Sequence, residues 1–583
     1  MAMRSWPRFY QENGGLVAGL HTRNAGHNRP TIKGHPPMST VTGHAERDIN
    51  SQAGKDFSDR VRANQELLSA ALKPRYDFIV CGAGSSGSVV ARRLAENPAV
   101  SVLLLEAGGD DSVPAVTDAD QWPTNLGSER DWAFRATANA RLNGRCLPMS
   151  MGKVLGGGSA INVMVWARGH RSDWDHFAQA AGDPAWGYDA VLGIYRRIED
   201  WHGAPDPDYR GIGGPVFVQP APEPSPLVPA ALAGARSVGI PTFENPNGRM
   251  MEGPGGAAIS DIRVRNGKRE SIFRSYAYPL MDRPNLTVLT EALVTRVAFD
   301  ATRATGVEIV YRGSNLIIGA ESEVVLSLGA IHTPKVLMCS GIGDDAELRS
   351  AGVPVRQHLP GVGRNFQDHV ALYSVWQHRI PLPPRNNMSE STVYWTMSDS
   401  DSPDVFICHA EVPFGSDETV ARFGLPSAGW TMAAGIAHPE SRGRVQLTGP
   451  SPHDPIHIDA NTFAEPEDFK TAIACVDLCR EIGNSPALRP FVSREVMPGN
   501  LKGRERDVFI RDAATSYWHQ CGTAKMGRDA DSVVDASLRV YGIDNLRVAD
   551  ASIMPRITTG NTMAPCVIIG ERAAQLLIAD HSG

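Results

Sequence analysis

The chain has 583 residues, of which 42% are hydrophobic and 57 are glycines, and this composition is typical of a globular protein with a sizeable core. Its formal net charge of −7 at pH 7 argues against nucleic-acid binding, because there is no excess of Lys and Arg to neutralise phosphates. No stretch approaches the ~18 consecutive apolar residues of a transmembrane helix. At roughly 100–200 residues per domain, the length corresponds to about three to five domain-sized units.

The first part of the chain differs in composition from the rest. Residues 26–43 are rich in Gly, Pro, Thr and His and show no apolar period, so we expect residues 1–55 to form a disordered extension. We interpret residues 1–37 as an over-extended start, an added expression sequence or a disordered tail. Apolar residues spaced along 56–72 then predict an amphipathic helix, within a segment 56–75 that leads into the next domain. Pro74 is expected to end it.

Cysteine usage limits the class of protein further. Eight cysteines in 583 residues are too few for a disulfide scaffold, and their spacing includes neither a CxxC pair nor a zinc-binding Cys/His pattern. We therefore expect no metal site and a reducing, cytoplasmic location.

A dinucleotide-binding fingerprint follows. The strand-like run YDFIVC at 76–81 precedes Gly82, Gly84 and Gly87 in G-x-G-x-x-G spacing, then a helical pattern and a second apolar run that ends at Glu106. Gly82 permits a tight turn, Gly84 lets the backbone approach a pyrophosphate, and Gly87 allows close helix–strand contact. The Glu106 carboxylate can accept hydrogen bonds from a ribose diol. From these residues alone, both FAD and NAD remain possible cofactors.

Four further blocks identify a family. They read GKVLGGGSAINVMVWARG at 152–169, GAIHTPKVLMCSGIG at 329–343, YWHQCGTAKMG at 517–527, and NLRVADASIMPRITTGNTMAP at 545–565. Together with the fingerprint they resemble the glucose–methanol–choline (GMC) flavin oxidoreductases, in the family's order and over about residues 76–575. The resemblance implies FAD as the cofactor. It also implies an α/β plus α+β fold, in which a Rossmann-type FAD-binding domain carries an inserted, mostly antiparallel substrate domain.

The same resemblance predicts the domain boundaries. The FAD-binding domain is expected to be discontinuous and the substrate-binding domain to lie over the isoalloxazine ring. The predicted segments are 76–215, 285–371 and 511–583 for the FAD-binding domain, and 216–284 and 372–510 for the substrate-binding domain.

Further cofactor-binding residues are implied by the resemblance. In the Gly-rich block, low side-chain bulk lets backbone N–H groups approach a phosphate or the flavin edge, and the Asn162 amide can both donate and accept hydrogen bonds. Val294 is placed beside the adenine. Residues 558–565 open a helix whose N-terminus would point at the flavin C2 carbonyl and stabilise the negative charge of the reduced ring. Beyond the fingerprint, the implied residues are Ser86, Lys153, Leu155, Gly156, Gly157, Asn162, Met164, Val165, Val294, Asp550, Ala551, Thr562 and Met563.

The resemblance also concerns how FAD is held. Some relatives attach it covalently through a His in the Gly-rich block. The matching stretch 159–162 reads SAIN and has no His, so we expect non-covalent FAD.

Alcohol oxidation by a flavin requires that the hydroxyl proton leaves and that a hydride moves from carbon to flavin N5. His519 occupies the family's catalytic His position and is the candidate base. Asn561 matches the second catalytic position, where an amide can hold the substrate oxygen against that base. Gln520, Met563 and Cys566 depart from the usual family residues, and Met563 would remove a polar contact near the flavin.

The expected partners are a small-molecule alcohol and an electron acceptor, which is a quinone, another carrier or O2; a dehydrogenase is slightly favoured over an oxidase. Choline and aryl, furanic or aliphatic alcohols remain open as substrates. A hydroxynitrile lyase with non-redox FAD is the alternative function. A flavin-binding protein without activity is disfavoured, because both catalytic positions are filled.

Overall fold

The structure is a computed structural model that describes residues 52–398 and 400–581. Its contacts divide the described chain into a smaller unit, residues 52–72 with 281–284, and a larger unit that contains the rest. The expected N-terminal extension, residues 1–55, lies outside the described residues except for 52–55, which are helical.

Helix α3, Gln52–Ala70, is the main element of the smaller unit. Within this unit, Asn64 Nδ2 donates to the carbonyl oxygen of Met281 at 2.7 Å. The helix begins before the predicted segment 56–75 and ends well before that segment does. Its end has a local cause, because the ring of Pro74 would clash with the carbonyl four residues earlier in a continuing helix.

In the larger unit, a seven-stranded sheet carries the fingerprint. Its order is β11-β2-β1-β14-β13-β12, and β25 pairs with β14. Pairing is parallel from β11 to β14 and to β25, and antiparallel across β12, β13 and β14. β2 is buried along its whole length, as a strand of a parallel sheet covered on both faces must be. The strands are β1 (Arg75–Cys81), β2 (Val102–Leu105), β11 (Leu286–Leu289), β12 (Ala292–Asp300), β13 (Arg303–Tyr311), β14 (Ser314–Leu326) and β25 (Leu546–Val548).

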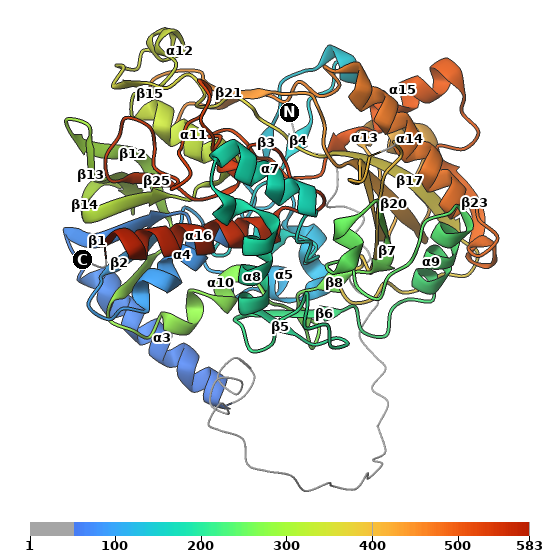
Figure 1. The fold of residues 1–583 in the computed structure, drawn as a ribbon, viewed down its shortest axis with the longest axis horizontal. Helices are drawn as coiled ribbons and strands as arrows, with labels where there is room; N and C mark the ends of the chain where they lie inside the picture. Colours follow the sequence, from blue (N-terminus) through green and yellow to red (C-terminus); the bar gives the residue numbers. More distant parts are fainter. Residues whose placement is uncertain (1–51, 399, 582–583) are drawn as a thin grey trace, which may run out of the picture. The chain divides into compact units, whose positions relative to one another are not determined.

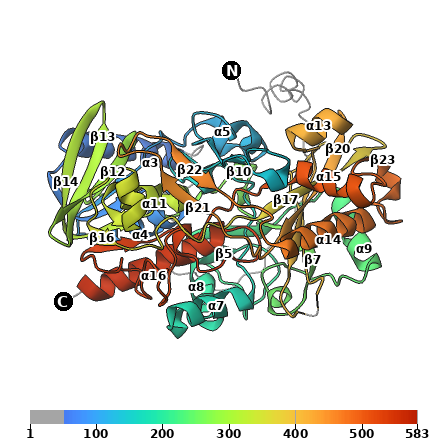
Figure 2. The ribbon, with the colours of Figure 1, turned by 90° about the horizontal axis from the view of Figure 1, so that it is seen from above.

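Two helices pack together against this sheet. Helix α4 (Ser85–Ala95) makes the crossover between β1 and β2, which confirms the predicted strand–helix–strand fingerprint. Helix α16 (Met563–His581) lies beside α4, although almost 500 residues separate them in the chain (Figures 1 and 2). Gly570 permits this approach, since a Cβ there would lie 2.7 Å from the Ser86 carbonyl oxygen.

A second seven-stranded sheet is antiparallel throughout, as expected for the substrate domain of this fold. Its order is β23-β17-β20-β19-β18-β7, and β24 pairs with β17. Helix α14 (Pro466–Gly483) covers β17 and β20, and Figure 2 shows it along this sheet. The strands are β7 (Gly255–Ile259), β17 (Val370–His378), β18 (Ser391–Trp395), β19 (Val405–Ala410), β20 (Gly429–Ile436), β23 (Val492–Met497) and β24 (Thr515–Ser516).

Shorter elements complete the larger unit. The remaining α-helices are α5 (Pro114–Thr117), α6 (Gly158–Ile161), α7 (Arg171–Ala181), α8 (Tyr188–Ile198), α9 (Leu227–Ser237), α10 (Ile272–Ser275), α11 (Gly329–Cys339), α12 (Asp345–Ser350), α13 (Asp417–Phe423) and α15 (Gly503–Ala513). The small sheets contain β3 (Phe134–Arg135) with β4 (Pro148–Met149), β5 (Glu199–Trp201) with β6 (Val216–Pro220) and β8 (Asp261–Ile262), β9 (Val264–Arg265) with β10 (Lys268–Arg269), β15 (Ile342–Gly343) with β16 (Gln357–His358), and β21 (Arg444–Leu447) with β22 (Ile456–Asp459).

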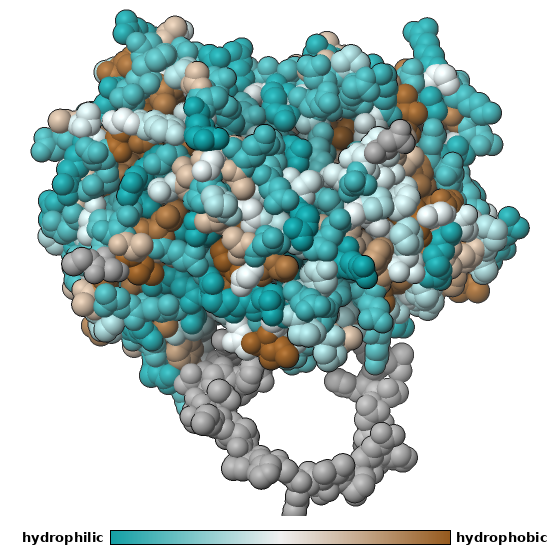
Figure 3. Space-filling view, viewed as in Figure 1, coloured by the Kyte–Doolittle hydropathy of each residue, from teal (hydrophilic) through white to brown (hydrophobic). Residues whose placement is uncertain are grey.

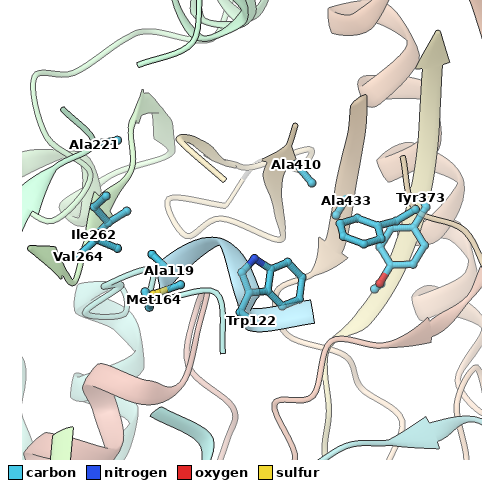
Figure 4. Close-up of a cluster of buried hydrophobic side chains, with 11 residues drawn as sticks. Ala119, Trp122, Met164, Ala221, Ile262, Val264, Tyr373, Ala410 and Ala433 are labelled. Carbon is cyan, nitrogen blue, oxygen red and sulfur yellow. The ribbon is translucent and has the colours of Figure 1, made fainter. Parts of the chain in front are cut away.

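A buried apolar cluster connects the second sheet to the segments around it. Trp122, Met164 and Ile262 come from preceding segments, and Tyr373 and Ala433 come from β17 and β20 (Figure 4). The face of the molecule in Figure 3 is mainly hydrophilic, with scattered apolar patches. Among the described residues, no helix is both long and apolar enough to cross a membrane.

Candidate functional site

The turn between β1 and α4 is formed by glycines that the backbone requires. Gly82 has φ +99°, and a Cβ on it would lie 2.3 Å from the Ser327 carbonyl oxygen. A Cβ on Gly87 would lie 1.9 Å from the Gly82 carbonyl oxygen, so the helix can approach the strand only with glycine here. At Gly84, the N-cap of α4, a Cβ would meet nothing within 4 Å. The first turn of α4 therefore presents backbone N–H groups beside an open approach, which suits an anion such as a phosphate.

The Gly-rich block lies directly on this turn. Gly156 donates its N–H to the Ala83 carbonyl oxygen at 2.9 Å. Gly157 has φ +51°, and a Cβ there would lie 2.8 Å from Gly84 Cα. The structure thus brings together two predicted motifs that are about 70 residues apart, and their contact is backbone against backbone. Of the other predicted residues here, Leu155 is buried, and Lys153 places its Nζ 4.9 Å from the ring centroid of Trp132.

Glu106 follows β2 and is buried. Its Oε2 accepts the N–H of Ala83 at 3.1 Å, and its Oε1 accepts the N–H of Gly108 at 2.9 Å. Burial raises the pKa of this carboxyl to about 7, although the backbone hydrogen bonds oppose the rise. The side chain therefore holds the turn and the next loop in place, and the same carboxyl has the hydrogen-bonding capacity for a ribose diol.

Val294, on β12, lines a cavity of about 160 Å³ with an aromatic wall. The ring centroids of Trp132 and His332 lie 4.1 Å apart in that wall. Burial, reinforced by Lys335, lowers the pKa of His332 to about 3, so the imidazole is neutral. A cavity with a wall of neutral aromatic rings is suited to a flat heterocycle such as a purine. The lining residues are Trp132, Leu293, Val294, Thr295, His332, Lys335, Val336, Cys339, Pro452 and His453.

Asp550 and Ala551 follow β25, at the edge of the first sheet where β1 also ends. Asp550 Oδ2 accepts the N–H of Gly329 at 2.9 Å and the hydroxyl of Thr333 at 2.6 Å. The Asp550 side chain thus fastens the start of α11 to the end of the sheet. Ala551 uses its carbonyl oxygen to accept the N–H of Gly522. These contacts place both predicted residues beside the Gly82 turn, since Ser327 also donates its hydroxyl to the Ala549 carbonyl oxygen.

Asn162 connects the Gly-rich block to the start of α16. Its Oδ1 accepts the N–H of Met164 at 2.9 Å and Nη1 of Arg269 at 2.9 Å. Its Nδ2 lies 3.1 Å from Sδ of Met563. Met164 adopts φ +59°, and Thr562 accepts the N–H of Cys566 on its carbonyl oxygen. Val165, the remaining predicted residue of this block, is buried and pairs with the small sheet beside it.

The structure places the two predicted catalytic residues side by side. His519 Nε2 lies 3.3 Å from Asn561 Nδ2, and both side chains are buried. On the other side of the ring, His519 Nδ1 lies 2.8 Å from Nδ1 of His369. His369 Nε2 lies 2.9 Å from the carbonyl oxygen of Ala437.

These distances determine which nitrogens carry protons. A carbonyl oxygen only accepts, so Nε2 of His369 is the protonated nitrogen. A neutral His369 then has an unprotonated Nδ1, which accepts the proton on Nδ1 of His519. His519 is left with an unprotonated Nε2, to which the Asn561 amide donates. The result is a basic lone pair beside an amide donor, which is an arrangement for removing a proton from a hydroxyl group.

The surroundings keep the His519 ring neutral and fixed. Burial lowers the pKa of His519 to about 3. The ring stacks on Tyr517 with centroids 5.3 Å apart, and the backbone N–H of His519 donates to Asp368 Oδ1 at 2.8 Å. Trp518 adopts φ +61°, and its Nε1 is buried without a hydrogen-bond partner in the described chain. Asn561 Oδ1 is likewise buried without one. Two orphaned polar atoms beside the base mark this as a site for a polar ligand.

Sequence reasoning did not find three residues that complete the site. His369 and Asp368 lie about 150 residues before His519, and an Asp–His dipeptide ahead of a strand-like run carries no signal of its own. Asp173 was also missed. It accepts the N–H of Thr559 at 2.7 Å and lies 2.7 Å from Nε2 of His438, so it fastens the loop that carries Asn561.

The residues present fit FAD. The glycine cradle, which is the turn at Gly82, Gly84 and Gly87 before and within the start of α4, suits a pyrophosphate. Glu106 suits a ribose, and the cavity at Val294 suits an adenine. The amide oxygen of Asn561, which has no partner in the described chain, leaves a free acceptor for a polar ligand on the side chain next to the base.

Comparison with known proteins gives matches over most of the chain. Family models described as GMC oxidoreductase match residues 76–371 and 439–570. The chain is 34% identical to an alcohol dehydrogenase (acceptor) of Pseudomonas putida, covering 86% of this chain and 96% of that protein. It is 35% identical to the mitochondrial choline dehydrogenase of Homo sapiens, covering 88% and 91%.

Solved structures agree. The structure of a pyridoxine 4-oxidase from Mesorbium loti superposes with a TM-score of 0.82 at 34% identity, covering 86% of this chain and 99% of that chain. A formate oxidase superposes with a TM-score of 0.79 at 25% identity, covering 87% and 99%.

Proposed function

Because this chain belongs to the GMC oxidoreductase family, we propose that it oxidises an alcohol to an aldehyde or ketone, with non-covalently held FAD as hydride acceptor and His519 as general base. The observation that carries the proposal is the unprotonated Nε2 of His519, 3.3 Å from the amide nitrogen of Asn561. A lone pair held beside a hydrogen-bond donor can take the hydroxyl proton while the substrate oxygen stays fixed.

The residues that would hold the cofactor come from the separate blocks already described. FAD, when bound, supplies an acceptor for the hydride of the alcohol carbon. We propose that the α4 N-terminus and the Gly156–Gly157 turn receive the pyrophosphate, Glu106 the ribose, and the Val294 cavity the adenine. Non-covalent attachment is supported by 159–162, which contain no His.

The proton step uses two side chains. When the alcohol binds, Asn561 Nδ2 donates to the substrate oxygen instead of to His519, and the freed Nε2 of His519 takes the hydroxyl proton. His369 then stabilises the imidazolium, because its Nδ1 accepts the Nδ1–H of His519 before and after the transfer. Without that acceptor, a positive charge would form in a buried site with no partner on this side of the ring.

Four finer statements belong to the same proposal. We favour a dehydrogenase over an oxidase, since two of the similar curated proteins are named dehydrogenases. The acceptor would be a quinone, another carrier or O2. A cytoplasmic location is supported by the eight cysteines, all of which are free thiols in the structure. The proposed domains keep the boundaries predicted from the sequence.

The test is anaerobic reduction. Purified protein with a flavin spectrum is mixed, without air, with choline, benzyl alcohol, hydroxymethylfurfural, and short- and long-chain aliphatic alcohols. Bleaching of the ~450 nm band by one class supports the proposal, because it reports hydride arrival on the cofactor. Air is then admitted to compare an oxidase with a dehydrogenase. Intact FAD that no alcohol bleaches, together with cleavage of a hydroxynitrile, would replace the proposal with the lyase alternative.

A further inference from the structure

Arg269, at the end of β10, is a buried cation that has no carboxylate partner among the described residues. Its side chain is 7% exposed. Nε donates to the Val116 carbonyl oxygen at 2.8 Å, and Nη1 donates to the Ser159 carbonyl oxygen at 3.1 Å and to Oδ1 of Asn162 at 2.9 Å. Within the described chain, Nη2 is buried and has no hydrogen-bond partner. All of the guanidinium's acceptors are therefore neutral dipoles.

An unpaired buried charge of this kind destabilises the folded state. Burial, with a contribution from Arg263, lowers the pKa of Arg269 to about 9, which still leaves the group charged at pH 7. A buried ion without a counter-ion costs several kcal/mol, and an apolar residue of similar volume would avoid that cost. The position therefore calls for an anion that the polypeptide itself does not provide.

The contact with Asn162 indicates where that anion lies. Arg269 and the N–H of Met164 both occupy Oδ1 of Asn162, so the amide cannot turn over without losing both hydrogen bonds. Nδ2 is consequently directed at Sδ of Met563, and a thioether is a weak acceptor. Met563 is the first residue of α16, a 19-residue helix whose N-terminus carries partial positive charge. The Asn162 N–H donor and the N-terminus of α16 therefore meet at Met563, and Arg269 binds the oxygen of the same amide.

We propose that Arg269 is a positioning residue for flavin reduction. It locks the Asn162 amide so that Nδ2 faces the pyrimidine part of the flavin ring system, and its charge stabilises the negative charge that the reduced flavin carries there. The inference rests on the proposed function. In that reaction the alcohol carbon gives a hydrogen with two electrons to N5, and the hydroxyl gives its proton to His519. The ring therefore gains one negative charge, and Arg269 supplies its counter-charge.

The test uses holoenzyme and sulfite, which adds to flavin N5 and leaves a negative charge on the same ring. The sulfite dissociation constant is measured from loss of the ~450 nm band for wild type, Arg269→Gln and Arg269→Lys. We expect the sulfite dissociation constant to rise at least tenfold in Arg269→Gln. In Arg269→Lys, which keeps the charge, it should change less than threefold. A tenfold change in a two-electron equilibrium corresponds to about 30 mV, so the midpoint potential should fall with it.

Two further variants make the test specific. Asn162→Asp is isosteric and neutralises Arg269, so it should weaken sulfite binding in the same direction even if Arg269→Gln does not fold. Arg263→Gln is the control for the contact with Asn162. Arg263 is also buried and its charge lowers the pKa of Arg269, but it donates to Ser275 instead of Asn162, so the change in sulfite affinity should stay below threefold. Wild-type sulfite affinity and potential in both Arg269→Gln and Asn162→Asp would overturn the inference.

Failure of the inference about Arg269 can be distinguished from failure of the proposed function. Protein that binds no FAD would overturn both. Protein whose flavin is inert to every alcohol, but whose sulfite affinity follows the charge at position 269, would overturn only the proposed oxidation. Protein whose flavin is bleached by an alcohol, with sulfite affinity independent of that charge, would overturn only the role of Arg269.

Discussion

The two Nδ1 atoms of His369 and His519 lie 2.8 Å apart, and this contact assigns every proton in the site. Because the Ala437 carbonyl oxygen takes the Nε2 proton of His369, the proton between the rings belongs to His519. A neutral imidazole therefore serves as the acceptor that fixes the tautomer of the base. Unlike a carboxylate, it adds no negative charge, and so the base remains neutral in its buried position.

The first prediction concerns this acceptor. His369→Phe removes it and leaves a buried N–H on His519 unsatisfied, which costs about 1–3 kcal/mol. We expect the rate of flavin reduction by the alcohol to fall about tenfold to hundredfold, with FAD still bound. His369→Asn is the matched variant, because its amide oxygen can take the place of Nδ1 and should restore most of the rate. Equal losses in both variants would point to packing as the role of His369.

The second prediction concerns the base itself. His519→Ala should lower kcat by about 10²–10⁴-fold, the usual contribution of a positioned general base. The measurement is steady-state turnover with the best alcohol, on protein whose flavin content matches wild type. His358→Ala, at an exposed histidine, is the control and should be unchanged. A wild-type rate in His519→Ala with FAD bound would exclude the role.

The third prediction separates substrate positioning from cofactor binding. Asn561→Ala removes the amide that faces Nε2 of His519, so turnover should drop while the flavin spectrum remains. Flavin content and flavin-reduction rate are measured on the same preparation. Loss of flavin along with the rate would instead make Asn561 a structural residue.

The sequence was sufficient for the motifs whose chemistry is local. The G-x-G-x-x-G turn, the two strands around it and Glu106 lie within about 30 residues, so their spacing predicts their geometry. The antiparallel sheet followed from family resemblance, and no periodicity predicted its strand order. His519 and Asn561 were also identified through motif positions, and the structure places them in contact.

Other parts of the site depend on contacts that only folding creates. His369, Asp173 and Arg269 reach their partners from 150, 386 and 107 positions away in the sequence. Each is an ordinary polar residue in its local context.

The fourth prediction tests the contact between the two glycine motifs. Gly157→Ala would place a Cβ 2.8 Å from Gly84 Cα at a φ of +51°, so the turn must move away from the cradle. We expect at least a tenfold loss of FAD affinity, measured by reconstituting apoprotein with FAD. Gly193→Ala, on α8, is the control, because a Cβ there also meets nothing within 4 Å and the residue lies outside both glycine motifs. Equal FAD affinity in the two variants would contradict the proposed pyrophosphate site.

The fifth prediction concerns a buried pair of carboxyl groups, Glu390 and Glu411. Burial, together with the neighbouring Glu390, raises the pKa of Glu411 to about 9. The unfolded chain releases that proton near pH 4.3, whereas the folded chain keeps it up to about pH 9. The contribution of Glu411 to the free energy of unfolding is therefore fully present below about pH 4.3. It is lost as the pH rises from about 4.3 towards about 9, at up to about 1.4 kcal/mol per pH unit.

Glu411→Gln keeps the shape and removes the titration. Its melting temperature should approach or exceed that of wild type as pH rises from 5 to 8, because the titrating groups other than Glu411 and its neighbour Glu390 are common to both proteins and cancel. Thermal melts across this range measure the difference. Glu467→Gln, at an exposed glutamate, should instead follow the wild-type profile at every pH. A Glu411→Gln profile parallel to wild type would show that Glu411 is already ionised in the folded protein at pH 5.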